Sequence, residues 1–415
     1  MRCGAGLLGR YTDTLFRRKI FCAERKVRSR MHFMQPQVPP GSTIGLLGGG
    51  QLGRMFGIAA RRMGYRVHTY EPAPDSPAGQ ISDREFTGAY GDIDLVDEFV
   101  QSVDVVTFEF ENIPAEVVNR ISRSRPVHPR SEVLHICQNR EREKAFLRKR
   151  GYPHVPFEIV TSQSELEEAL TRIGAPAVLK AADFGYDGKG QLKIMPGGLP
   201  RFEDVKAERA VLEKWIQFQC ELSVICARGI DGVVSSFPVA ENIHTNQILD
   251  YSIVPARLPE SVQNAACEIA KSIAREMEVV GLIAIEFFLT EKGELFVNEL
   301  APRPHNSGHF TLDACLTSQF EQQLRAVCGF PFGSPQLLTP VVMVNLLGDL
   351  WRNGRQPDWN AVLRKPAVKL HLYGKLDSRP GRKMGHFCCL APTVEVAVRE
   401  ALKLKHELIG ASHDS

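Results

Sequence analysis

The residues with the clearest chemical potential are a carboxylate and the polar loop that follows it. The segment 294–298 (Glu-Leu-Phe-Val-Asn) predicts an apolar strand, and Glu299 comes directly after it. The loop beyond contains Pro302, Pro304 and Gly308, residues that disfavour both a helix and a central strand. Several polar side chains must therefore project from irregular backbone, namely Arg303, His305, Asn306, Ser307 and His309.

A neighbouring strand is expected to bring a second carboxylate close to Glu299. The apolar run 282–289 contains Glu286, and the turn 290–293 (Thr-Glu-Lys-Gly) between two apolar runs is typical of a hairpin. This hairpin sets Glu286 almost opposite Asn298 and Glu299. Carboxylate and amide oxygens suit Mg²⁺, which also binds substrate phosphates. The alternative is a rim of acids paired with a nearby arginine. We favour the metal, because an unpaired charge in an apolar strand is costly to bury.

A glycine-rich loop lies upstream of the hairpin. The run 177–180 (Ala-Val-Leu-Lys) predicts a short strand that ends in Lys180, and the segment 184–191 (Phe-Gly-Tyr-Asp-Gly-Lys-Gly-Gln) follows. Its glycines let the backbone approach a ligand and present N–H groups to anionic oxygens, while Lys189 adds positive charge. The alternative is a plain glycine hairpin with solvated lysines. The order of residues is not that of a Walker A loop.

The first apolar segments predict a Rossmann-like lobe. Gly48, Gly50 and Gly53 fit G-x-G-x-x-G after a strand, and Glu71 ends the next strand near the position of a ribose-binding acid. A dinucleotide-binding domain is therefore the rival interpretation. We find no residues for hydride chemistry downstream, so we interpret the glycine turn and helix N-terminus as contacts for another anionic substrate. Glu109 ends a further buried strand, where such sheets bind ligands; the alternative is a surface acid.

The order of these features resembles the ATP-grasp superfamily, in which ATP lies between two α+β lobes. The lysine-ended strand and glycine loop come first, the segment 210–216 (Ala-Val-Leu-Glu-Lys-Trp-Ile) and Glu221 follow, and the acidic hairpin comes last. Within the superfamily, residues 43 to about 390 resemble the 5-(carboxyamino)imidazole ribonucleotide synthases of purine biosynthesis. Five motifs in order carry this resemblance: 48–55 (Gly-Gly-Gly-Gln-Leu-Gly-Arg-Met), 107–114 (Thr-Phe-Glu-Phe-Glu-Asn-Ile-Pro), 185–191, 298–309 and 379–386 (Arg-Pro-Gly-Arg-Lys-Met-Gly-His).

The resemblance implies an ATP site. By this resemblance, Lys180 and the glycine loop bind the phosphates, the backbone of 213–216 binds adenine, and Glu221 binds the ribose. It also implies Mg²⁺, with Mn²⁺ as the alternative ion, on Glu286, Asn298 and Glu299. The full set of implied ATP contacts is Arg140, Lys180, Gly185, Tyr186, Asp187, Gly188, Lys189, Gly190, Gln191, Glu213, Lys214, Trp215, Ile216, Glu221, His244, Asn298 and Glu299.

The resemblance further implies a C–N bond-forming ligase. ATP, bicarbonate and aminoimidazole ribonucleotide would give 5-(carboxyamino)imidazole ribonucleotide, ADP and phosphate through carboxyphosphate. The implied catalytic residues are Asp187 at the substrate amine, and Arg303 and His305 at bicarbonate or the imidazole. The implied ribonucleotide contacts are Gln51, Leu52, Glu109, Asn306, Ser307, Arg379, Arg382 and Lys383. The alternatives are another ATP-grasp ligase, such as the formate-dependent glycinamide ribonucleotide transformylase, and a non-catalytic nucleotide-binding regulator.

The basic turn 379–386 is the implied site for the substrate 5′-phosphate. Arg379, Arg382 and Lys383 place three positive groups within five residues, held by Pro380 and Gly381. Basic clusters form charge-assisted hydrogen bonds to phosphate. The alternative is a solvated basic loop.

Length and composition indicate several globular domains of mixed α/β and α+β class. The chain has 415 residues, of which 43% are hydrophobic and 24% charged, and no apolar run approaches the length of a membrane span. We expect a Rossmann-like (pre-ATP-grasp) domain at 41–139, an ATP-grasp domain at 140–339 with a small lobe at about 155–213, and a small β-rich C-terminal domain at 340–415.

The first 40 residues differ from the rest in charge. They hold nine Lys/Arg and two Asp/Glu, which leaves 42 basic and 46 acidic residues elsewhere, so the sequence does not favour a nucleic-acid partner. We expect 1–40 to lie outside the fold, as a transit peptide or an over-extended start. The ten scattered cysteines, without C-x-x-C spacing, indicate a cytoplasmic protein, or one in an organelle stroma or matrix if 1–40 is a transit peptide. From the family we expect a homodimer and a separate mutase as functional partner.

Overall fold

A parallel sheet builds the first lobe, as the sequence predicts. The computed structural model describes residues 37–183, 190–198, 200–351 and 356–410. β1 (Thr43–Leu47) lies between β2 (Arg66–Glu71) and β4 (Val105–Phe108), and β3 (Arg84–Thr87) follows β2, so the order is β3-β2-β1-β4. The helices of this lobe are α2 (Gln51–Arg62), α3 (Ile93–Gln101), α4 (Ala115–Ile121) and α5 (Ser131–Cys137).

A small antiparallel sheet comes next in the chain. Its strands, in the order β5-β8-β6-β7, are β5 (Phe157–Val160), β6 (Ala177–Ala181), β7 (Gln191–Ile194) and β8 (Ala210–Lys214). α6 (Arg140–Arg150) leads into this lobe, and α7 (Gln163–Ile173) packs on β5 and β8. The sheet therefore carries Lys180 on β6 and Glu213 on β8, on neighbouring strands.

The start of α7 has a capping arrangement that the sequence indicates. Ser162 Oγ accepts a hydrogen bond from the Glu165 N–H at 3.3 Å. The Glu165 carboxylate accepts a hydrogen bond from the Thr161 N–H at 2.7 Å. In a standard capping box this carboxylate would accept from the N-cap residue itself, which here is Ser162, one residue later. The helix ends at Ile173, and Gly174 follows as its C-cap.

One large sheet of nine strands forms most of the remainder, and we call it the large sheet. Its order is β14-β13-β9-β11-β12-β15-β17-β16, and β10 pairs with β9. The strands are β9 (Cys220–Arg228), β10 (Val234–Ser236), β11 (Ala240–Thr245), β12 (Ile248–Val254), β13 (Gly281–Leu289), β14 (Leu295–Ala301), β15 (Val341–Leu347), β16 (Val368–Leu372) and β17 (Lys383–Leu390). The accompanying helices are α8 (Glu260–Glu276), α9 (Thr311–Ala314), α10 (Gln319–Val327), α11 (Trp359–Leu363) and α12 (Val394–Gly410).

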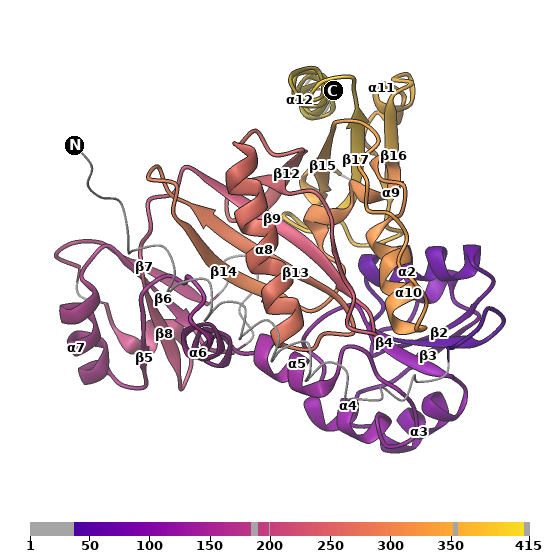
Figure 1. The fold of residues 1–415 in the computed structure, drawn as a ribbon, viewed down its shortest axis with the longest axis horizontal. Helices are drawn as coiled ribbons and strands as arrows, with labels where there is room; N and C mark the ends of the chain where they lie inside the picture. The colour runs from indigo at the N-terminus through magenta and orange to yellow at the C-terminus, as the bar shows by residue number, and fades with distance from the viewer. Residues whose placement is uncertain (1–36, 184–189, 199, 352–355, 411–415) are drawn as a thin grey trace, which may run out of the picture. The chain divides into compact units, whose positions relative to one another are not determined.

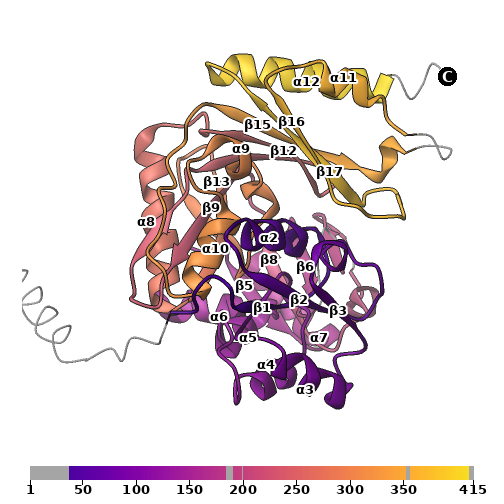
Figure 2. The same ribbon diagram turned by 90° about the vertical axis from the view of Figure 1, so that its right-hand side faces the viewer.

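The C-terminal strands continue the large sheet, a connection that the sequence did not indicate. β15 pairs with β12 through Tyr251–Val344 and neighbouring pairs, and β17 then pairs with β15. Figures 1 and 2 show β12, β15, β17 and β16 side by side, with α12 and α11 along them. The acidic hairpin and the strand that follows the basic turn therefore belong to one hydrogen-bonded sheet.

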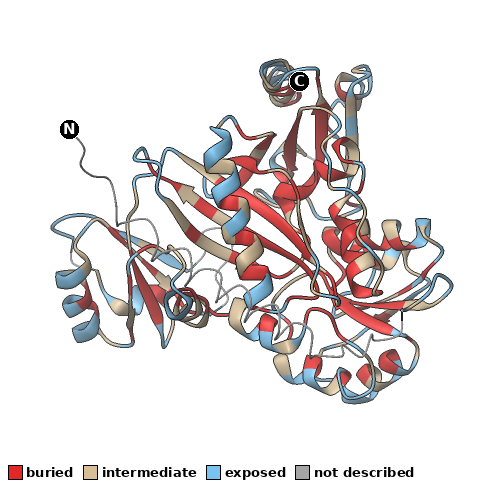
Figure 3. Cartoon of the chain, in the orientation of Figure 1, coloured by how far each residue is buried: buried red, intermediate tan, exposed pale blue. Residues whose placement is uncertain are grey.

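The core lies on the faces of these sheets, where strand residues are buried and helices turn apolar sides inward (Figure 3). α8 illustrates the pattern, because Ala266, Ala270, Ile273 and Ala274 recur at helical spacing and are buried against the strands. Their small size lets the helix approach the sheet closely. Within the described ranges, no helix has the length and apolar character needed to cross a membrane.

Residues 37–40 belong to the folded part, which corrects the expected boundary at residue 40. The Val38 N–H donates to Cys328 O at 3.1 Å, and the Tyr65 hydroxyl donates to Val38 O at 2.7 Å. Gln37 Nε2 also donates to Gly329 O at 3.2 Å. The rest of the expected extension, residues 1–36, lies outside the described residues.

A chain that starts at Gly41 should melt a few degrees lower than a chain that starts at Gln37. The shorter chain loses the two hydrogen bonds of Val38, each worth about 1 kcal/mol. Thermal melts of the two chains, side by side, measure the difference. Equal melting temperatures would show that residues 37–40 contribute nothing to stability.

Candidate active site

A cavity of about 1240 Å³ gathers residues from the first lobe, the small sheet and the large sheet. It is lined by most of the site residues that the sequence singled out. These are Gln51, Leu52, Glu109, Arg140, Lys180, Gln191, Glu213, Lys214, Trp215, Ile216, Glu221, His244, Glu286, Asn298, Glu299, Arg303, His305, Asn306, Arg382 and Lys383.

Three described candidates do not line this cavity. Ser307 is fully buried behind His305, so it cannot contact a substrate directly. Arg379 has a side chain that is 70% exposed, and its Nε pairs with Asp377 at 2.7 Å. The third residue, Gly190, does not line the cavity, and its carbonyl accepts a hydrogen bond from the Ala181 N–H. The other loop candidates, Gly185, Tyr186, Asp187, Gly188 and Lys189, lie outside the described residues.

The acidic hairpin has the predicted register. Glu286 on β13 lies opposite Glu299 on β14, and Asn298 Nδ2 donates to Glu286 Oε2 at 3.4 Å. Burial, followed by the charge of Glu299, raises the pKa of Glu286 to about 7. A cation would relieve this excess of negative charge, so the oxygen-rich set fits Mg²⁺. Among the described residues, no group of three or more His, Cys, Asp or Glu side chains could hold a metal by itself.

Two adjacent side chains of α6 hold the strand that carries Glu299. Lys144 Nζ donates to Asn298 O at 2.9 Å, and the Leu300 N–H donates to Glu143 Oε2 at 2.9 Å. The backbone is thus fixed on both sides of Glu299. The sequence does not indicate this role, because the run of charges in α6 suggests a solvated helix, whereas Lys144 is fully buried.

Glu143 should make the stability of the protein depend on pH. Burial raises its pKa to about 8, from an ordinary value of 4.5. Between these values the folded chain keeps a proton that the unfolded chain has lost, so stability falls as pH rises through this window. The Glu143→Gln variant lacks this penalty. Its melting temperature relative to wild type should therefore increase from about pH 5 to about pH 8 and then level off.

The matched control is Glu141→Gln on the same helix. The pKa of Glu141 is lowered, mainly by its hydrogen bond with Arg209, so its charge does not change above pH 5. Melts in metal-free buffer across the window should show a constant offset for this variant. A constant offset for Glu143→Gln as well would contradict the prediction.

A chain of buried charges joins the small sheet to the large sheet. Lys180 Nζ lies 2.7 Å from Glu213 Oε2, and Lys144 Nζ lies 3.5 Å from Glu213 Oε1. Burial alone would raise the pKa of Glu213, but the two lysines lower it to about 2. Glu213 is therefore a fixed anion that orients both ammonium groups. Arg140 extends this region to the hairpin, with Nη1 3.8 Å from Glu299 Oε2.

One end of the cavity is aromatic. Lys193 Nζ lies 3.7 Å from the centre of the Trp215 ring, and Phe218 stacks on Phe288 with ring centres 4.7 Å apart. Nearby, His244 Nδ1 and Glu221 Oε2 are 2.7 Å apart, which positions the Glu221 carboxylate. The sequence did not indicate the stacked phenylalanines, since they come from separate segments without a local pattern.

Three amides of the first lobe's glycine turn and helix start donate to the protein's own carboxylates and not to a ligand, contrary to our interpretation. The Gly49 N–H donates to Glu71 Oε2 at 2.7 Å. The N–H groups of Gly50 and Gly53 donate to the Glu109 carboxylate at 2.7 and 3.1 Å. These two carboxylates take up three of the amides at the start of the helix, so an anionic ligand needs further positive partners.

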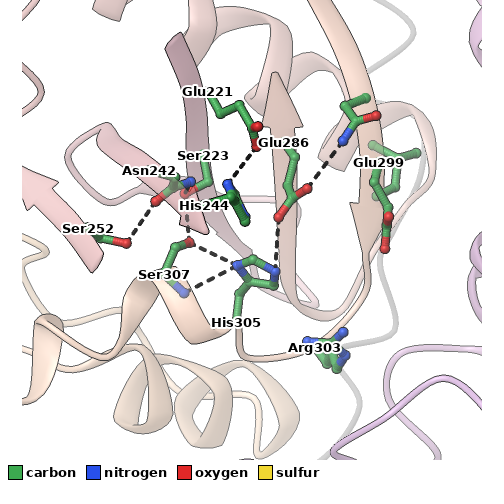
Figure 4. Close-up of polar contacts among 12 residues, drawn as sticks. Glu221, Ser223, Asn242, His244, Ser252, Glu286, Glu299, Arg303, His305 and Ser307 are labelled. Carbon is green, nitrogen blue, oxygen red and sulfur yellow. Dashed lines mark hydrogen bonds and ion pairs between the residues drawn. The ribbon is translucent and has the colours of Figure 1, made fainter. Parts of the chain in front are cut away.

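Positive groups do lie elsewhere on the cavity wall. Arg382 and Lys383 line it as expected, together with Lys375, which sequence analysis missed. Lys375 Nζ donates to Lys383 O at 2.7 Å, so it is held beside the turn. Near the hairpin, Arg303 Nε lies 2.7 Å from Glu111 Oε1. His305 Nε2 lies 3.4 Å from Glu286 Oε1 (Figure 4).

Three families match successive parts of the chain. They are the ribonucleotide synthetase preATP-grasp domain at residues 42–138, the ATP-grasp domain at 145–320, and the phosphoribosylaminoimidazole carboxylase C-terminal domain at 341–400. Among curated proteins, the N5-carboxyaminoimidazole ribonucleotide synthase of Bacillus subtilis (strain 168) is 46% identical over 356 residues. That match covers 84% of this chain and 91% of the relative.

Solved structures give the same result. An ADP complex of an N5-carboxyaminoimidazole ribonucleotide synthetase matches with a TM-score of 0.83 and 43% identity, covering 90% of this chain and 98% of the other. The N5-carboxyaminoimidazole synthase of Aspergillus clavatus, in complex with ADP and 5-aminoimidazole ribonucleotide, matches with a TM-score of 0.80 and 30% identity. It covers 88% of this chain and 98% of the other.

Proposed function

The chain belongs to the N5-carboxyaminoimidazole ribonucleotide synthase family of ATP-grasp ligases, and on this basis we propose which residues perform each part of the reaction. The chain is a ligase that uses ATP to carboxylate 5-aminoimidazole ribonucleotide to N5-carboxyaminoimidazole ribonucleotide, in purine biosynthesis. One observation carries the division of roles: a single cavity joins an aromatic end, an acidic hairpin and a basic turn.

ATP would lie from the aromatic end to the hairpin. The apolar wall at Phe218 and Phe288 suits the adenine ring, and the Glu221 carboxylate can accept hydrogen bonds from ribose hydroxyls. Lys180 and Arg140 then supply positive charge for the phosphates. Glu286, Glu299 and Asn298 would hold Mg²⁺ next to these phosphates. The ion supplies positive charge that offsets the charge of the transferring phosphoryl group.

Bicarbonate would bind beside Arg303 and His305. Bicarbonate is a poor electrophile, so its oxygen first attacks the γ-phosphorus of ATP, and ADP leaves. The resulting carboxyphosphate is an activated carboxyl group. The exocyclic amine of the ribonucleotide attacks its carbon, phosphate leaves, and the amine loses a proton. The protein contributes mainly by holding these groups together and by placing cations near the developing charge.

The ribonucleotide would lie with its phosphate at Lys375, Arg382 and Lys383. This placement follows from charge, because internal carboxylates already take up the amides of Gly49, Gly50 and Gly53. Glu109 also lines the cavity and can accept hydrogen bonds from the ribose hydroxyls. Gln51, Leu52 and Asn306 line the same cavity.

A coupled assay of ADP release tests the function. Release should require both aminoimidazole ribonucleotide and bicarbonate, and the carboxylated product should appear in equal amount. Release that instead depends on formate and glycinamide ribonucleotide would support the other ATP-grasp ligase. ATP binding without turnover under either condition would support the regulator.

We also propose the assembly and location. All eight cysteines of the described residues are free thiols, which supports a reducing compartment such as the cytoplasm, with an organelle stroma or matrix as the alternative. Light scattering tests the expected homodimer. The product of this site carries its new carboxyl group on nitrogen. A separate mutase is therefore the enzyme expected to use this product next. Mixing the two enzymes and following the rearranged product tests this coupling.

A further inference from the structure

A row of buried polar side chains leads away from His305 into the large sheet (Figure 4). Ser307 Oγ lies 2.8 Å from His305 Nδ1, and Ser223 Oγ lies 2.6 Å from Ser307 Oγ. Asn242 Nδ2 donates to Ser223 Oγ at 3.0 Å, and the Ser252 hydroxyl donates to Asn242 Oδ1 at 2.8 Å. We call Ser307, Ser223, Asn242 and Ser252 the serine–asparagine row. Each member is at most 5% exposed.

The backbone determines how the row meets the imidazole. The Ser307 N–H donates to His305 Nδ1 at 3.4 Å, and a backbone N–H can only donate. His305 Nδ1 must therefore carry a lone pair. The same nitrogen also faces the Ser307 hydroxyl, whose single hydrogen can point either at Nδ1 or at Ser223 Oγ.

The far end of the row decides between these two directions. The Asn242 amide donates to Ser223, so the oxygen of Ser223 serves as the acceptor and its hydroxyl hydrogen is left to point at Ser307. The Ser307 hydroxyl can then point at His305. Every hydroxyl in the row thus donates one hydrogen bond toward His305. Because the row is buried, water does not compete for these hydrogen bonds.

The tautomer of His305 follows from this direction. A neutral imidazole carries one N–H, and if Nδ1 accepts, the proton is on Nε2. Nε2 faces the cavity, 3.4 Å from Glu286 Oε1. We propose that the serine–asparagine row holds His305 as the Nε2–H tautomer, so that it donates a hydrogen bond to the bicarbonate or carboxyphosphate oxygens and does not act as a general base. This inference rests on the proposed function. It makes Ser223 and Asn242 positioning residues.

The direct test is the protonation of the two ring nitrogens in the wild-type chain. The protein labelled with ¹⁵N-histidine gives separate NMR signals for protonated and unprotonated nitrogens, and the His305→Gln spectrum assigns the signals of His305. The expected result is that Nδ1 of His305 is unprotonated and Nε2 is protonated. A protonated Nδ1 would overturn the inference, and this reading needs no catalytic turnover. If the wild-type chain lacks bicarbonate-dependent ADP release, the proposed function fails whatever the tautomer.

The kinetic test compares two buried serines of the same sheet. Ser223→Ala interrupts the row between Asn242 and Ser307, and should lower kcat by about 10- to 100-fold with KM for ATP nearly unchanged. Its ring-nitrogen signals should also move toward a mixture of tautomers. Ser252→Ala removes a hydroxyl of equal burial at the outer end, and should lower kcat by a smaller factor. Equal losses in the two variants would mean that the row serves only stability, and would overturn the inference.

Asn242→Asp provides an independent, nearly isosteric test. A carboxylate has no N–H to give to Ser223, so the Ser223 hydroxyl would donate to it and the direction of the row would reverse. The variant should lose kcat as Ser223→Ala does. Wild-type kcat in this variant would show that the direction of the row is irrelevant, and would overturn the inference.

Discussion

Replacement of Glu299 by Gln should nearly abolish ATP turnover while the melting temperature stays close to that of the wild-type chain. The carboxylate is 42% exposed, and its only ion pair, among the described residues, is with Arg140 at 3.8 Å, so its charge contributes little to folding. Its proposed task is to hold Mg²⁺ against the ATP phosphates. Loss of that charge should reduce the rate of ADP release by about 10²- to 10³-fold or more.

The matched control is Glu291→Gln in the turn of the same hairpin. Glu291 is exposed and does not line the cavity, so the same chemical change there should leave ADP release unaltered. Both variants are assayed at saturating substrates and ordinary Mg²⁺, with a thermal melt of each. Near-normal turnover by Glu299→Gln would remove Glu299 from the metal site.

The second large effect is expected for Lys383→Ala, which should raise KM for the ribonucleotide about 10- to 100-fold. The substrate phosphate is a dianion, and a charge-assisted hydrogen bond to it is worth about 1.5–3 kcal/mol. ATP would contact other cations, chiefly Lys180 and Arg140, so KM for ATP should stay close to wild type.

Arg379→Ala is the control for this prediction, because it removes a positive charge from the same turn. Arg379 is exposed, pairs with Asp377 and does not line the cavity. Its loss should change KM for the ribonucleotide by less than about twofold. If Lys383→Ala raises KM for ATP instead, or if both variants behave alike, the turn does not bind the substrate phosphate.

Local patterns predicted the elements that short-range interactions determine. The turn 290–293 predicted the register that brings Glu286 opposite Glu299. The pairing of β12 with β15 was not predictable, because residues far apart in sequence meet there without a distinctive motif. The resemblance suggested a site, but it did not separate Arg382, which lines the cavity, from Arg379, which does not.

Buried partners of site residues were the least predictable. Lys144 looked like one charge among many on a helix, and only its burial distinguishes it. Ser223 and Asn242 lie on different strands, so nothing in the sequence connects them with each other or with His305. Such contacts depend on how the strands align, and one sequence carries no direct record of that alignment.

The hydrogen bonds of Glu143 and Lys144 on α6 with the backbone of β14 also affect how the protein behaves at high concentration. β14 is the last strand of the large sheet, and an open strand edge is a template on which another chain can add a strand. Here Glu143 and Lys144 take up backbone groups of that edge, and a bridge between His154 and Val297 covers a further part. The residues that hold Glu299 in place thereby protect the sheet against intermolecular β-pairing and aggregation.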